Sequence, residues 1–129
     1  MKETFDFLIR KHNTPHPHYD LFLKVGNELR SWIVPTSIPT NKSDKKVAIE
    51  VDVPKQSLEE AEAQEMIEDA YGVGETKLWD KGTYTLDSHK NIKIVFNAEG
   101  SKFNGTFLLH VPNWGRWTKK RLWTMEKIK

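Results

Sequence analysis

The chain has 129 residues, of which 29% are charged and none is cysteine, and its formal net charge is +2. This length suits one domain, residues 1–129, whose core is large enough to fold without disulfides or a structural metal. The absence of cysteine excludes disulfide scaffolds, thiolate metal sites and cysteine nucleophiles, and it fits a cytoplasmic protein. No apolar run approaches the roughly 20 residues of a membrane-spanning helix, so we expect no membrane partner.

The first half of the chain alternates apolar and polar residues with the period of two that is typical of β-strands. One pair of these strands is joined by the turn sequence Gly26-Asn27, which predicts a hairpin. A loop rich in Pro, Thr, Ser and Lys separates the last strand of this half from the others. The predicted strands are residues 5–10, 17–25, 29–34 and 47–53.

An acidic segment follows these strands. Residues 57–69 hold six Asp and Glu and no Lys or Arg, so the rest of the chain carries 20 basic against 12 acidic residues, a net charge of +8. Ser57, with Glu60 three residues later, matches the capping box that begins many helices. We therefore predict a helix from Ser57 to about Asp69. Because its charge would repel phosphate, we expect it to lie away from a nucleic-acid-binding face, or to dock a partner protein or a basic patch of the same protein.

The second half returns to short strands separated by turn sequences. The predicted strands are residues 75–79, 83–86, 91–97, 106–111 and 122–128, with turns at Asp80-Lys81-Gly82 and Glu99-Gly100. Short strands in this number with one substantial helix indicate a mainly β protein. We predict a small antiparallel β-barrel of about eight or nine strands, or a sandwich, with one acidic helix packed on it.

The carboxyl-terminal residues 114–129 are basic and rich in tryptophan. Six Lys and Arg stand against one Glu, with Trp114, Trp117 and Trp123 among them. This mixture is typical of surfaces that bind a nucleic-acid backbone beside unstacked bases. A solvated edge strand whose Trp side chains face the core is the alternative. The candidate nucleic-acid contacts of this segment are Arg116, Lys119, Lys120 and Arg121.

Three histidines and an aspartate lie within nine residues: His12, His16, His18 and Asp20. His18 and Asp20 are two residues apart on a predicted strand, so their side chains leave the same face. The turn after His12 contains two prolines that stiffen it, and it can bring His12 back over this face. Two imidazoles and one carboxylate then form a three-ligand site, which favours manganese, iron or zinc over magnesium.

Two other interpretations of these histidines stay open. They can be polar residues on a solvated sheet face that bind nothing. Alternatively, His16 and His18 resemble the H-x-H pair of cupin-like metal enzymes, which also need a Glu and a later His. Glu28 and His110 are the residues that the chain offers for those two places.

Several short motifs, taken in order, resemble one known family. They are Phe7–His12, His18–Leu23, Leu29–Pro35, Val47–Val51, Tyr71–Gly74, Leu78–Tyr84, Phe107–Val111 and the basic end at Leu122–Lys127. Together they resemble the 3′-phosphoesterase domain of bacterial DNA ligase D and its free-standing archaeal relatives, over nearly the whole chain. We therefore expect a free-standing, divergent member of that family.

The resemblance implies a small β-barrel whose concave face holds one site for Mn²⁺. It carries His12, His18 and Asp20 over as the metal ligands. It also implies hydrolysis at the 3′ end of a nucleic-acid strand in DNA repair, which removes a terminal ribonucleoside and then the phosphate left behind. The partners that it implies are a nucleic-acid 3′ end and separate ligase and polymerase proteins.

The chain departs from the family at several positions where the resemblance implies catalytic groups. Phe22 stands in place of an arginine, Val53 of a histidine and Ser57 of a tyrosine. Arginine clamps phosphate with its two-pronged guanidinium, and a general acid protonates the leaving oxygen, so other groups must supply both functions. The remaining candidates are His16 and His110 for proton transfer, and Arg10 and Lys11 for phosphate charge.

Three hypotheses follow. The first is a divergent manganese-dependent 3′-phosphoesterase. The second is a degenerate member that binds nucleic-acid ends through the basic, Trp-rich segment without catalysis. The third is a cupin-like metal enzyme built on His16 and His18. Substitution of His12 by Ala abolishes metal binding under the first hypothesis and spares it under the third.

Overall fold

A computed structural model of the chain describes residues 4–25, 28–52, 57–69, 72–90, 92–112 and 122–129. In this part of the chain nine strands form one antiparallel sheet, in the order β1-β2-β3-β4-β9-β8-β7-β6-β5. The elements are β1 (Thr4–Asn13), β2 (His18–Val25), β3 (Glu28–Val34), β4 (Lys45–Val51), α1 (Leu58–Ala63), β5 (Met66–Asp69), β6 (Gly72–Lys90), β7 (Lys93–Gly100), β8 (Asn104–His110) and β9 (Leu122–Lys127).

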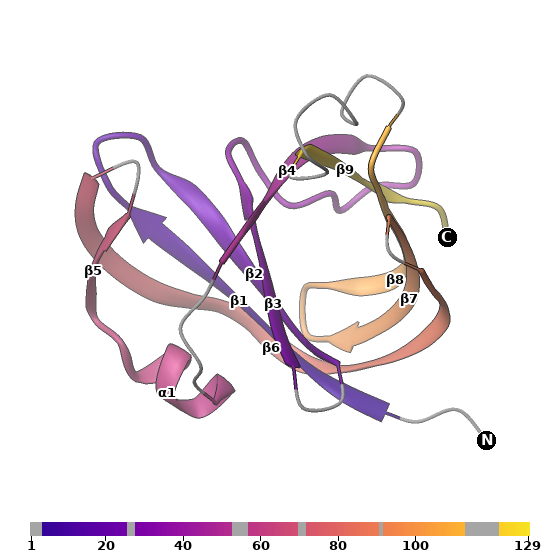
Figure 1. Cartoon of the computed structure of the whole chain (residues 1–129), viewed down its shortest axis with the longest axis horizontal. Helices are drawn as coiled ribbons and strands as arrows, with labels where there is room; N and C mark the ends of the chain where they lie inside the picture. The colour runs from indigo at the N-terminus through magenta and orange to yellow at the C-terminus, as the bar shows by residue number, and fades with distance from the viewer. Residues whose placement is uncertain (1–3, 26–27, 53–56, 70–71, 91, 113–121) are drawn as a thin grey trace.

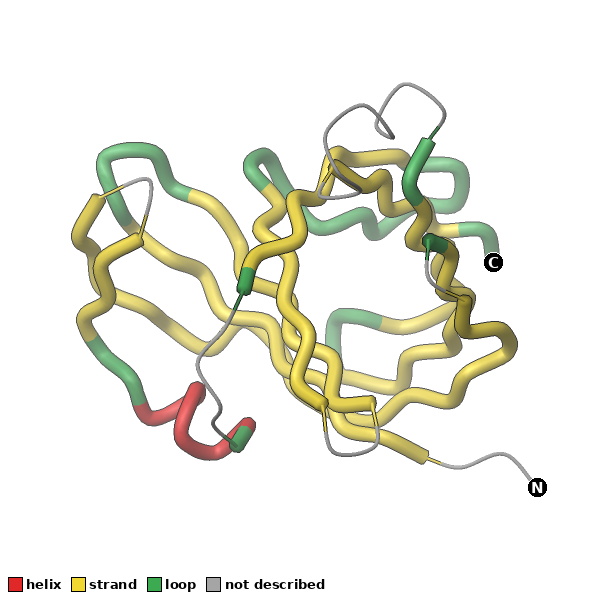
Figure 2. The backbone as a smooth tube through the Cα atoms, viewed as in Figure 1, coloured by secondary structure: helices red, strands yellow, loops and turns green. Residues whose placement is uncertain are grey.

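Pairing between β1 and β6 closes the sheet into a barrel (Figure 1). The strand β6 is 19 residues long and pairs with β1, with β7 and, at its beginning, with β5. Eight strands therefore form the closed barrel, and β5 is an extra strand that lies outside it beside α1 (Figure 2). The prediction of a small antiparallel barrel with one helix is confirmed.

The barrel wall formed by β1 and β2 has two buried faces. Phe7 and Ile9 of β1, with Leu21 and Leu23 of β2, point into the main core, where Trp32 and Trp123 also pack. The intervening side chains point outward, because alternate residues of a strand leave opposite faces. On that outer face, the side chains of Leu8 and Phe22 pack against Leu58 and Ala61 of α1. The helix therefore covers the outside of this wall.

The acidic segment forms a shorter helix than its sequence predicts. Ser57 caps α1 through the predicted capping box with Glu60, but the helix ends at Ala63. Residues Met66–Asp69 then form β5, which pairs with the start of β6, so the prediction of a helix as far as Asp69 is wrong. The first residues of β6 form backbone hydrogen bonds with β5 in a hairpin. The capping-box signal that predicts the start of the helix does not reveal this pairing. No helix in the described residues is long and apolar enough to cross a membrane.

One long strand replaces two predicted strands. The predicted turn at Asp80-Lys81-Gly82 is wrong, because β6 continues through it with a register shift against Ile9 and Arg10. The Asp80 carboxylate instead accepts hydrogen bonds of 2.7–3.2 Å from four backbone N–H groups, those of Lys81, Ser101, Lys102 and Phe103. Asp80 thus holds the turn between β7 and β8.

Candidate metal centre

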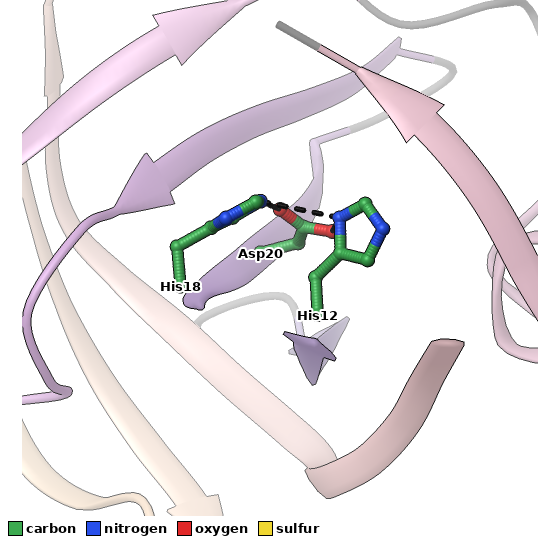
Figure 3. A group of neighbouring side chains, drawn as sticks. All are labelled: His12, His18 and Asp20. Carbon is green, nitrogen blue, oxygen red and sulfur yellow. Dashed lines mark hydrogen bonds and ion pairs between the residues drawn. The ribbon is translucent and has the colours of Figure 1, made fainter. Parts of the chain in front are cut away.

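His12, His18 and Asp20 lie together on the outer face of β1 and β2 (Figure 3). The two strands pair antiparallel, with His12 opposite His18 and Arg10 opposite Asp20. The strand alternation that sends Ile9 and Leu21 into the barrel core sends these side chains the other way. The resemblance implied a concave face of the barrel. The structure places the cluster outside the barrel core, on the wall that α1 covers.

The geometry of the cluster suits a shared cation. The three donor groups lie within 4.8 Å of one another, and the His12 Nδ1–His18 Nε2 distance is 3.2 Å. His18 Nε2 lies 3.4 Å from Asp20 Oδ1, and His12 Nδ1 lies 3.9 Å from Asp20 Oδ2. Donors held at about 2.1 Å from one divalent ion are separated by about 3.0–3.5 Å. The predicted convergence of the three side chains is therefore confirmed.

Backbone carbonyls orient both imidazoles. His12 Nε2 donates to the carbonyls of Ile67 and Gly74, at 3.0 and 3.2 Å, and His18 Nδ1 donates to the carbonyl of His16, at 3.0 Å. These contacts turn His12 Nδ1 and His18 Nε2 toward each other and toward the Asp20 carboxylate. The donor set, with its outer hydrogen bonds in place, therefore fits a metal ion.

Asp20 completes the donor set as a carboxylate. Burial raises its pKa, but hydrogen bonds from His18 and Arg10 lower it more, so that the pKa lies below its ordinary value. Arg10 Nε donates to Asp20 Oδ2 at 2.8 Å. Asp20 is therefore ionised at neutral pH, as a metal-ligating carboxylate must be.

Arg10 and Lys11, the expected phosphate contacts on β1, occupy different surroundings. Lys11 is exposed, whereas Arg10 is buried, and its guanidinium lies 4.8 Å from the centre of the Phe22 ring. Arg10 Nη1 also donates to the Ala61 carbonyl and to Gln64 Oε1. Sequence reasoning missed Gln64, which lies 54 residues away and carries no local signal that could have revealed this contact.

The two histidines expected to transfer protons lie at different distances from the cluster. His16 is exposed, and its backbone carbonyl binds His18. His110 lies on β8, which is four strands away from β2 in either direction around the barrel. Since neighbouring strands are about 4.8 Å apart, the structure does not bring His110 to the cluster. Burial and the nearby charge of Lys45 lower the pKa of His110. This lowered pKa therefore gives no sign of a role for His110 in the candidate metal centre.

Several expected site residues lie outside the described residues. They are Val53, Arg116, Lys119, Lys120 and Arg121. Ser57 is described, and its side chain caps α1.

The acidic helix packs beside the cluster instead of lying away from it. The apolar residues Leu58 and Ala61 bind α1 to the wall that carries the cluster, and the Ala61 carbonyl accepts from Arg10. A groove of about 420 Å³ separates another part of α1 from β1 and β6. Its rim carries Asp6, Glu59 and Glu62, and Glu62 pairs with Lys81 at 3.1 Å. These carboxylates repel phosphate, so this groove is not a phosphate site.

The fold and the cluster together define a small β-barrel with a two-histidine, one-carboxylate candidate metal centre on its outer wall. Residues 10–111 match the family described as the DNA Ligase D 3′-phosphoesterase domain. The chain belongs to this family.

Similar proteins contain the matching region as a small part of a longer chain. The chain is 34% identical over 122 residues to the multifunctional non-homologous end joining DNA repair protein LigD of Mycobacterium tuberculosis, and the match covers 90% of this chain and 16% of that protein. It is 26% identical over 129 residues to the multifunctional non-homologous end joining protein LigD of Pseudomonas aeruginosa, covering 95% and 15% respectively. The chain thus spans about one sixth of the length of these relatives.

Proposed function

We propose that the protein is a manganese-dependent 3′-phosphoesterase that acts on 3′-phosphate or 3′-ribonucleotide ends of nucleic acid in DNA repair. The observation that carries the proposal is the convergence of two oriented imidazole nitrogens and one carboxylate oxygen within 4.8 Å. Family membership supports the reaction class, and the names of the relatives, which refer to non-homologous end joining, support a role at DNA ends. Separate ligase and polymerase proteins are the proposed partners.

His12, His18 and Asp20 would hold the metal ion. When bound, a divalent cation polarises a phosphoryl oxygen and lowers the pKa of water that attacks it. The β5–β6 carbonyls fix His12, and the His16 carbonyl fixes His18. Asp20 keeps the largest side-chain exposure of the three, 7% against 0% and 1%, so the substrate approaches from the carboxylate side.

The remaining roles fall to His16, which is exposed beside the cluster, and to the basic end of the chain. The exposed imidazole of His16 gives a proton to the leaving oxygen. Lys11 leaves β1 on the face opposite to His12, so it is not proposed as a phosphate contact of the cluster. The nucleic-acid strand is bound by Arg116, Lys119, Lys120 and Arg121.

A metal titration followed by a 3′-end assay tests this function. Wild-type protein should bind Mn²⁺ and release phosphate or a nucleoside from 3′-phosphate and 3′-ribonucleotide ends of DNA only when Mn²⁺ is present. His12→Ala, His18→Ala and Asp20→Asn should lose metal binding, and the exposed His89→Ala is the matched control that should keep it. Wild-type protein that binds no metal, or binds it and releases nothing, would overturn the proposal.

Binding of nucleic-acid ends without catalysis is a second candidate function. The near-complete burial of the cluster, with side-chain exposures of 0%, 1% and 7%, favours it, as do Phe22 and Ser57 at positions where the resemblance implies catalytic groups. This function predicts affinity that falls steeply with salt and no product. Metal binding that survives His12→Ala would instead favour the cupin-like alternative.

A further inference from the structure

We propose that Arg10 is a positioning residue that orients Asp20 in the metal centre, and that Gln64, at the end of α1, holds Arg10 in place. The inference rests on the proposed metal centre. It gives Arg10 a different role from the phosphate contact expected from the sequence, and it adds Gln64, which the sequence did not reveal. It also gives α1 a function, because the helix end then supports the ligand set.

The contact between Arg10 and Asp20 decides which carboxylate oxygen faces His18. Arg10 is 8% exposed, and its Nε donates to Asp20 Oδ2 at 2.8 Å. The other oxygen, Oδ1, is left 3.4 Å from His18 Nε2. A carboxylate without this hydrogen bond would rotate about its own axis, and neither oxygen would be held toward the histidines. Hydrogen bonds of this kind orient metal ligands and raise metal affinity.

The other side of the guanidinium is held by α1. Arg10 Nη1 donates to the Ala61 carbonyl and to Gln64 Oε1, both at 2.9 Å, and the Phe22 ring supports the guanidinium plane at 4.8 Å. Gln64 is itself fixed, because its carbonyl accepts from Thr76 Oγ1 at 2.5 Å. Thr76 lies opposite His12 in the β1–β6 pair. The contacts therefore run from the strand beside His12, through Gln64 and Arg10, to Asp20.

The arrangement requires an arginine. A guanidinium donates in two directions from one rigid plane, whereas a lysine ammonium is a single point of charge on a flexible stem. Nε and Nη1 of Arg10 are already occupied by Asp20 and by α1. A phosphate would have to displace these contacts to be clamped, so their geometry favours positioning over substrate binding.

Two variants that preserve the positive charge next to Asp20 test the geometry of Arg10 apart from its electrostatic effect on the metal. Arg10→Lys should weaken Mn²⁺ affinity about 10- to 100-fold, the usual effect of losing an outer hydrogen bond to a ligand. Gln64→Ala should weaken it in the same direction and by less, because Ala61 still binds Arg10. Free Mn²⁺ is measured by electron paramagnetic resonance during titration. The spectrum of bound Co²⁺ reports whether the ligand geometry has changed.

Arg30→Lys is the matched control. Arg30 is also ion-paired, to Glu50 at 2.8 Å, and its guanidinium lies over Trp32 and Trp123, but it has no contact with the cluster among the interactions of the described residues. This variant should keep wild-type Mn²⁺ affinity even where its thermal stability falls. Thermal unfolding of each variant shows that the protein titrated is folded.

Three outcomes would overturn the inference. Unchanged Mn²⁺ affinity in folded Arg10→Lys would show that Arg10 serves stability alone. Unchanged Mn²⁺ affinity with weaker binding of a 3′-phosphate end would make Arg10 a substrate contact. If Arg10→Lys does not fold, unchanged affinity in Gln64→Ala decides against the inference. Failure of the proposed function is distinguishable, because it appears in the wild-type protein, which then binds no Mn²⁺ or binds it and releases no product.

Discussion

Asp80 shows what one ionised side chain does for this barrel. It accepts four backbone N–H groups and holds the turn between β7 and β8 against β6. Gly100 fits beside it, because a Cβ at this position would overlap Asp80 Oδ2 and lie 2.6 Å from Phe7 Cζ. The turn is therefore built around the carboxylate, and its stability should depend on the charge of that group.

Asp80→Asn should destabilise the protein at neutral pH and much less in acid. Burial raises the pKa of Asp80, but the four N–H groups lower it more, so it lies below the ordinary 3.8. A carboxyl with a depressed folded pKa stabilises the fold above its unfolded pKa, and the stabilisation is lost as pH falls through the folded pKa. We expect a loss of about 1–3 kcal/mol at pH 7 in urea unfolding. The loss should shrink as the pH is lowered through 3.8 and below.

Asp44→Asn is the control for this titration, because the Asp44 carboxylate forms an ion pair with the partly exposed Lys46 side chain, at 3.5 Å, and accepts no backbone N–H among the hydrogen bonds of the described residues. A loss for Asp80→Asn that stays the same from neutral to acid pH would contradict the account. So would an equal loss for Asp44→Asn.

At the scale of single residues, the sequence predicts contacts between residues that are close along the chain and misses contacts between residues that are distant along it. The convergence of His12, His18 and Asp20 could be predicted, because a period of two places His18 and Asp20 on one face, a short stiff turn can return His12 to it, and the family resemblance implies all three as ligands. The contact of Arg10 with Gln64 could not be predicted, because it depends on where α1 ends and how it packs. His110 was included as a candidate because residue type alone says nothing about which barrel wall carries it.

The strand β6 lies tightly against β1 at Gly74. A Cβ at this position would overlap the Asn13 carbonyl oxygen and lie 2.7 Å from Thr14 N. The Gly74 carbonyl also accepts from His12 Nε2. The absence of a side chain therefore lets β6 approach closely enough to orient a metal ligand.

Gly74→Ala should move β6 away from β1 and disturb His12. We expect a loss of stability of about 1–3 kcal/mol, as for other overpacked sites, together with weaker Mn²⁺ binding. Urea unfolding and metal titration measure the two effects. Ser88→Ala, on the same strand and beyond its β1 partners, should change neither. Wild-type metal affinity in Gly74→Ala would contradict a role of this strand in orienting His12.

Ser57→Ala should loosen α1. The Ser57 side chain accepts from the backbone N–H of Glu60, and Glu60 reaches back to the Ser57 N–H, so both interactions of the capping box are present. Loss of such a cap costs about 1 kcal/mol. Hydrogen exchange should therefore be faster in Leu58–Ala63 of the variant than in wild-type protein. Unchanged exchange there would show that the cap is dispensable, and that packing on Leu8 and Phe22 and the contact of Arg10 with Ala61 hold the helix.

Among the elements, the alternation of apolar and polar residues predicted most of the strands. The capping box predicted where the helix begins, but the predicted helix is too long. Residues 57–69 contain a true helix start, but Met66–Asp69 pair with β6 instead of continuing it. The sequence Asp80-Lys81-Gly82 is typical of a turn, yet it lies inside β6 because Asp80 binds the backbone of another turn. In both places a tertiary partner overrides the local preference.

Metal binding should stabilise the whole molecule, because the unfolded chain does not hold the three ligands together. A ligand at 100 times its dissociation constant adds about 2.7 kcal/mol to the free energy of unfolding. The melting temperature of wild-type protein should therefore rise with Mn²⁺ concentration and return to its starting value with a chelator. His18→Ala should show no such rise. A similar rise in His18→Ala would place the stabilising ion elsewhere in the molecule.

The two-faced wall formed by β1 has a consequence for how such proteins diverge. Inward residues such as Ile9 are constrained by the volume available in the barrel core. Outward neighbours such as Arg10 and His12 are constrained by their contacts in the candidate metal centre. Point substitutions can therefore accumulate on one side while the other is preserved. A single-residue deletion within this strand would disrupt both faces together, because it would turn inward side chains outward and outward side chains inward. Natural variation along β1 should thus consist of replacements, with insertions and deletions confined to the strand ends.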